Sequence, residues 1–142
     1  MRTLPQTHKH IATAILAVIA ACGSMAAMSE TVTLTGSNEV PPATTSATGT
    51  ANITIGADRS VKASVTTTGM TATASHIHMG AAGSNGPVIV PFTKSGDNAF
   101  SAAPDAKLTE EQFAAYKAGK LYVNVHSAKD PGGEIRGQLK GS

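Results

Sequence analysis

Hydrophobic and polar residues alternate along much of the chain beyond residue 30, and this alternation is typical of strands with one buried face. Thr31–Thr35 places Val32 and Leu34 on one side and threonines on the other, and residues 51–55 and 61–66 repeat the pattern. Because the β-branched threonine side chain is restricted in helices, threonine-rich outer faces also favour strands. Further strands are predicted at residues 74–79, 87–92, 120–127 and 134–139.

One segment, residues 109–119, has the signals of a helix. Thr109 suits the N-cap, and Gln112 stands three positions later, as in a capping box. Acidic residues follow the cap, and Gly119 is placed to end the helix. We therefore expect a single short helix before the predicted strand 120–127.

Turn residues separate the predicted strands. Residues 56–59 predict a hairpin between the second and third strands, and residues 128–133 form a turn cluster. We expect a flexible turn at residues 81–86 and a polar loop at residues 93–98. With seven or so strands and no alternation of strands with helices, the chain is predicted to be one all-β domain. Its architecture is expected to be an antiparallel β-sandwich or a flattened Greek-key-like barrel.

The first 27 residues have the layout of a secretory signal: a basic polar start, an apolar run and then small residues. The apolar run is shorter than the roughly 20 residues that a membrane span needs. Two ways of processing stay open. Residues 19–22 resemble a lipobox, in which Cys22 would be lipidated, whereas Ser24–Ala26 resembles an ordinary cleavage site. We expect residues 28–142 to be an exported domain, which is periplasmic, bound to the cell envelope through a lipid, or secreted.

Loss of this signal changes the charge of the protein. The whole chain has 11 Lys and Arg against 9 Asp and Glu, but Arg2 and Lys9 belong to the signal. The mature domain is therefore neutral, and it has neither a basic cluster nor an aromatic platform, so a nucleic-acid partner is not expected. It also lacks cysteine once Cys22 is excluded, which rules out a disulfide framework.

Histidines are the strongest chemical signal in the mature domain. His76 and His78 are two residues apart and point to the same side of a predicted strand, with Ile77 facing the core. His126 lies opposite the apolar face of another strand. If the two strand ends meet, three imidazoles converge, and imidazole suits copper and zinc. The alternative is that these rings only hydrogen-bond to the backbone or to a neighbouring carboxylate.

Two methionines near this pair affect the choice of metal. Met79 adjoins His78, and Met70 precedes the pair by a short loop. A thioether ligand would favour Cu(I), and copper in an exported compartment is plausible, so we expect copper before zinc.

Several motifs in order resemble the CHRD domain, first described in chordin. They span most of the mature chain: Leu34–Pro42, Ala47–Thr50, Ser75–Gly80, Asn85–Val88, Tyr122–His126 and Pro131–Leu139. The family usually has alanine where this chain has Ser75, and glycine where it has Met79. The resemblance implies an exported all-β module but little chemistry. In animals such domains belong to a secreted antagonist of bone morphogenetic proteins, an activity that a single domain does not inherit from its fold.

Other residues in these motifs have structural explanations as well as possible roles at a metal. Glu39, Glu134 and Arg136 can form an ion pair or a rim of ligands, although we expect Glu134 and Arg136 to bind loop backbone or each other. Asn124 shares a strand face with His126 and can orient that ring.

We expect no enzyme, because the chain has no nucleophile elbow, phosphate loop or evident pair of catalytic carboxylates. The histidines are reminiscent of copper,zinc superoxide dismutase, but that site needs more ligands, including a bridging imidazole. The sequence thus predicts a copper-binding module with no turnover. The alternative is a cell-envelope or extracellular module that binds a protein partner and has structural histidines; the oligomeric state is left open.

Overall fold

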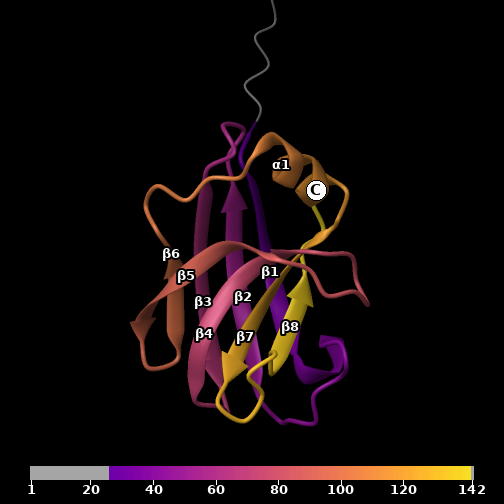
Figure 1. Ribbon diagram of the computed structural model, residues 1–142. Helices are drawn as coiled ribbons and strands as arrows, with labels where there is room; N and C mark the ends of the chain where they lie inside the picture. Colours follow the sequence, from indigo (N-terminus) through magenta and orange to yellow (C-terminus); the bar gives the residue numbers. More distant parts are fainter. Residues whose placement is uncertain (1–25, 142) are drawn as a thin grey trace, which may run out of the picture.

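The computed structural model describes residues 26–141, which form eight antiparallel strands, one helix and one 3-10 turn. Figure 1 shows the strands wrapped into a closed barrel, with α1 at one end of it. The elements are β1 Met28–Thr35, η1 Gly36–Asn38, β2 Thr48–Ile55, β3 Val61–Thr68, β4 Ala72–Met79, β5 Val88–Gly96, β6 Ala99–Ala102, α1 Glu110–Lys117, β7 Leu121–Ser127 and β8 Ile135–Gln138. Most of the predicted signal, including Cys22, lies outside the described residues.

The order of the strands around the barrel is β1, β2, β3, β6, β5, β4, β7, β8, and β8 returns to β1 through Thr35 and Arg136. The consecutive strands β4, β5 and β6 are neighbours, and β7 lies on the far side of β4, which is a Greek-key arrangement. The barrel form of the predicted fold is therefore confirmed.

Alternation along the strands builds the core, as the sequence predicts. Leu34, Ile53, Val65 and Ile77 are fully buried, while the threonines between such positions on β1 to β3 face outward. The predicted hairpin is present, because β2 and β3 pair from Ile55 and Val61 onward.

The helix forms where the sequence predicts it. Thr109 and Gln112 make both hydrogen bonds of a capping box, and Gly119 adopts a positive φ of 72° after the last turn. Tyr116 is buried, so the helix covers one end of the barrel. Within the described part of the chain, no helix has the length and apolarity to cross a membrane.

One prediction is wrong: residues 93–98 are not a polar loop. Strand β5 continues to Gly96 and pairs with β6, which the sequence did not predict. The side chains of residues 93–97 are exposed, so this end of the hairpin has no apolar face to produce an alternating pattern.

Strands β4, β7 and β8 place polar side chains in rows on the outer surface of the barrel. His78 pairs with Tyr122, His76 pairs with Asn124, and Asn124 pairs in turn with Arg136. His126 lies one step further along β7, opposite Ala74. Because β4 and β7 are direct neighbours, residues about 50 positions apart in the sequence share one surface.

Candidate metal centre

The three histidines come together on the outer surface of β4 and β7. His76, His78 and His126 each offer a ring nitrogen, and these three nitrogens all lie within 4.8 Å of one another. His78 is only 7% exposed, whereas His76 and His126 are partly exposed. The site is thus closed on the His78 side and open to solvent on the other.

Hydrogen bonds to loop carbonyls determine which nitrogen of each ring carries a proton. Nδ1 of His78 lies 2.9 Å from the carbonyl of Gly86, and Nδ1 of His126 lies 2.9 Å from the carbonyl of Pro131. A carbonyl oxygen only accepts, so both Nδ1 atoms are N–H donors, and in the neutral rings both Nε2 atoms carry lone pairs. This is the hydrogen-bond pattern of histidines that bind metals through Nε2.

The two lone pairs have different surroundings. Nε2 of His78 is buried and makes no hydrogen bond of good geometry, although the Asn124 side chain lies close enough to raise the His78 pKa against the effect of burial. Nε2 of His126 lies 3.1 Å from Nδ1 of His76, which therefore donates to it. If His76 instead carries its proton on Nε2, three unprotonated nitrogens face the same space.

Burial keeps the rings of His76 and His78 neutral. Burial, together with the charges of the nearby His126 and His78, lowers the pKa of His76 to about 4. Burial is also the main cause that lowers the pKa of His78. Neutral imidazoles near pH 7 leave the lone pairs available to a cation.

Asn124 lies opposite His76 in the strand pairing, and Glu39 is buried beside Asn124. Asn124 is 2% exposed and its Oδ1 has no partner; Glu39 is 4% exposed and its Oε1 has none. The backbone of Gly133 covers both, since a Cβ at this position would lie 2.5 Å from Glu39 Oε1 and 2.7 Å from Asn124 Nδ2. Burial raises the pKa of Glu39 to about 7, against the opposing effects of the Arg136 charge and the Asn124 amide.

Glu134 and Arg136 lie apart from the histidine nitrogens and bind loops. Arg136 donates to the carbonyls of Ala81 and Ser84, which confirms that it binds loop backbone. Glu134 accepts a 2.7 Å hydrogen bond from Thr45 Oγ1. Residues 81–86, expected to be a flexible turn, are therefore held to the barrel by Arg136.

Met70 and Met79 pack against the hydrophobic core. Met79 alternates with His78 along β4, so the two side chains leave opposite faces of the strand. The structure thus gathers the histidines into one cluster and places both methionine side chains with the apolar residues.

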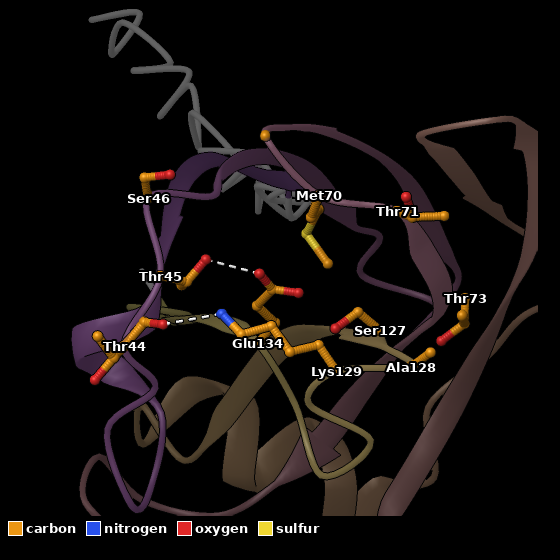
Figure 2. Close-up of a pocket in the computed structure, with 11 residues that line it drawn as sticks. Thr44, Thr45, Ser46, Met70, Thr71, Thr73, Ser127, Ala128, Lys129 and Glu134 are labelled. Carbon is orange, nitrogen blue, oxygen red and sulfur yellow. Dashed lines mark hydrogen bonds between the residues drawn. The ribbon is translucent and has the colours of Figure 1, made fainter.

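A separate hollow of about 820 Å³ lies between the loops at one end of the barrel. Figure 2 shows Thr44, Thr45 and Ser46 on one side and Thr71 and Thr73 on the other. Met70 and Glu134 point into the hollow between these two sides. Although burial acts to raise it, the pKa of Glu134 is lowered by hydrogen bonds from Ser127 and Thr45 and by the Lys129 charge.

Sequence reasoning missed two residues that touch His78. Tyr122 stacks on its ring, with centroids 4.8 Å apart and planes 4° apart, and Gly86 supplies its carbonyl partner. Tyr122, Asn124 and His126 are two residues apart along β7 and therefore share one face of the strand, and this spacing was the available signal. The approach of Gly86 depends on the path of a loop, which no local pattern reveals.

The fold and site define a closed Greek-key barrel that carries a three-histidine cluster on its outer surface, and such a cluster can hold a metal ion. The family model of the CHRD domain matches residues 31–139. The chain therefore belongs to the CHRD domain family, as its motifs suggest. No curated protein and no solved structure was found to match it.

The raised pKa of Glu39 predicts a specific pH dependence of stability. Between the ordinary value of 4.5 and the folded-state value of about 7, the folded protein keeps this proton and the unfolded chain has lost it. The stability from this group is therefore present below pH 4.5 and is lost as the pH rises through 7. We expect the free energy of unfolding of Glu39→Gln, relative to that of wild type, to rise by on the order of 1 kcal/mol between pH 5 and pH 8.

Urea unfolding at the two pH values measures this gain. Glu111→Gln, at an exposed position of α1, is the matched control and should show no such gain. If the free energies of unfolding of Glu39→Gln and wild type differ by the same amount at pH 5 and at pH 8, the prediction is wrong.

Proposed function

We propose that this CHRD domain is an exported module that binds one copper ion through His76, His78 and His126 and holds it without catalytic turnover. The observation that carries the proposal is the buried, unpartnered Nε2 of His78 within 4.8 Å of the other two ligand nitrogens. A buried polar atom with no partner is costly, and a cation at this position would use its lone pair.

The chemistry of the donors supports copper. All three ligands are imidazoles, which suit Cu and Zn, and at a given nitrogen site the affinity for Cu²⁺ exceeds that for Zn²⁺. With both methionines packed against the core, the support comes from the imidazoles and not from thioether sulfur. The rings are also held in place before the ion arrives, through the carbonyls of Gly86 and Pro131.

Export and the absence of turnover are parts of the same proposal. Export is supported by the signal-like layout of residues 1–27, and Cys22 offers a site for a lipid anchor. We propose binding rather than catalysis because the barrel and its loops hold the rings in fixed positions, which suits retention of an ion. The partner in the proposal is thus the metal ion, held in the periplasm or at the cell envelope.

A structural role of the histidines is the second candidate. Their hydrogen bonds join β4, β7 and two loops, which a purely structural cluster would also do. This role would fit a module whose ligand is another envelope protein. It gives the buried Nε2 of His78 only the Asn124 side chain as a polar neighbour, with no hydrogen bond of good geometry, whereas a metal ion would use the lone pair directly, which is why we favour the metal.

Isothermal titration of the metal-free protein with Cu(II), Cu(I) and Zn(II) tests the proposal. We expect one copper ion per chain, weaker binding of zinc, and loss of the site in a variant with all three histidines changed to glutamine. Equal weak binding by wild type and this variant would favour the structural role. Assays of redox turnover on the copper-loaded protein should give no activity that a chelator abolishes.

A further inference from the structure

Three flat groups lie in a stack beside the histidine cluster. The guanidinium carbon of Arg136 is 3.4 Å from the centre of the Tyr122 ring. The third member of the stack is the His78 ring, which is parallel to the Tyr122 ring within 4° at a centroid distance of 4.8 Å. Arg136 is 1% exposed and Tyr122 is 2% exposed, so solvent does not compete for these contacts. Cation–π contacts are strongest when they are desolvated in this way.

The same three residues hold the loop between β4 and β5. Arg136 donates to the carbonyls of Ala81 and Ser84 at 3.0 and 2.8 Å. The backbone N–H of Gly86 donates to the Tyr122 hydroxyl at 3.1 Å, and the carbonyl of Gly86 accepts from His78 Nδ1 at 2.9 Å. The stack fixes the plane of the His78 ring, and the loop that the stack holds fixes its proton on Nδ1.

We propose that Arg136 and Tyr122 are positioning residues that keep His78 in the Nδ1–H tautomer with Nε2 directed at the metal position. This inference deepens the proposed function and rests on it for its purpose, but the tautomer itself exists without metal. Neither side chain needs to touch the ion, because both act through the ring of His78 and the carbonyl of Gly86.

Arginine is specifically suited to this position. Its planar guanidinium covers an aromatic ring and at the same time donates in several directions within its own plane, which a lysine ammonium cannot do. A second effect adds to the geometry, since the positive charge of Arg136 disfavours a second positive charge on the nearby His78 ring. A lysine would keep that charge and lose the flat contact, so Arg136→Lys separates positioning from charge.

Tyr122 offers a matched pair of variants. Tyr122→Phe keeps a ring between Arg136 and His78 and loses only the hydroxyl that accepts from the Gly86 N–H, whereas Tyr122→Leu removes the ring as well. Glu30→Ala is a control for general loss of stability, since the Glu30 carboxylate accepts hydrogen bonds from the backbone N–H groups of Lys140 and Gly141 and belongs to a different region of contacts. If Arg136→Lys does not fold, the two Tyr122 variants carry the test.

The experiment combines two measurements on each protein. Long-range nitrogen–proton NMR of the metal-free protein reads the tautomer of His78, and Cu(II) titration reads the affinity. We expect the Nδ1–H tautomer in wild type, Tyr122→Phe and Glu30→Ala, and a mixture of both neutral tautomers in Arg136→Lys and Tyr122→Leu. In the last two variants the Cu(II) affinity should fall by about 10- to 100-fold.

The two proposals fail in different ways. If wild type binds copper and Arg136→Lys and Tyr122→Leu keep both the tautomer and the affinity, the positioning role is overturned and the metal site stands. If the tautomer changes in these variants but wild type binds no copper, the positioning role stands and the proposed function falls.

Discussion

Replacing His126 by alanine is expected to lower the affinity for Cu(II) by at least about 100-fold. This exceeds the usual effect of changing a residue that only hydrogen-bonds to a metal ligand. His126 is partly exposed, and its Nδ1 binds a loop carbonyl in a turn at the surface. The ring makes two hydrogen bonds, to Pro131 and to His76, so the free energy of unfolding should fall by about 2 kcal/mol. This variant separates binding from folding.

His78→Ala is the informative comparison. His78 is buried, stacks on Tyr122 and binds Gly86, so its removal should reduce both the copper affinity and the stability. Copper titration and urea unfolding of the two variants measure both quantities. Copper affinity that is unchanged in His126→Ala would remove this residue from the site.

Gly86→Ala is expected to have the second large effect, with a loss of about 2–3 kcal/mol in stability, as for overpacking of a well-filled region. A Cβ on residue 86 would overlap the backbone carbonyl of Met79, which belongs to β4 and does not give way easily. The loop would have to move away from the barrel, and the carbonyl that fixes His78 would move with it. Copper affinity should therefore fall in the same variant.

Gly132→Ala is the matched control for this substitution. A Cβ at Gly132 would meet no atom within 4 Å, so stability and copper affinity should remain close to those of wild type. Thermal unfolding and copper titration of the two variants check the prediction. A Gly86→Ala protein with wild-type stability and affinity would contradict the proposed link between this loop and His78.

Local alternation was enough to predict the faces of the strands. Ile77 faces the core and His76 and His78 face outward because side chains alternate along any strand with one buried side. Closure of the barrel follows from the pairing of β3 with β6, of β4 with β7 and of β8 with β1, which are distant in the sequence. Strand β6 escaped prediction because only Phe100 among its residues is buried.

The sequence predicted the candidate ligands of the site but not the groups that hold those ligands in position. Alternation places the three histidines on the polar faces of their strands, so the sequence could identify them as candidate ligands. They lie close together only because β4 and β7 are neighbours in the barrel. The choice of Nδ1 or Nε2 depends on the carbonyls of Gly86 and Pro131, which loops bring into place. Asn124 was expected to act on His126, and in the barrel it lies opposite His76 and beside Glu39, a residue 85 positions earlier in the chain.

The three-histidine copper site is tested by the copper X-ray absorption spectrum of the protein loaded with one equivalent of copper. Three imidazoles give a characteristic multiple-scattering pattern around the metal, distinct from that of oxygen or sulfur ligands. We predict a shell dominated by imidazole nitrogen from the three histidines, and its loss when all three are changed to glutamine. A shell without imidazole, or the same spectrum from wild type and variant, would show that these histidines do not bind the copper.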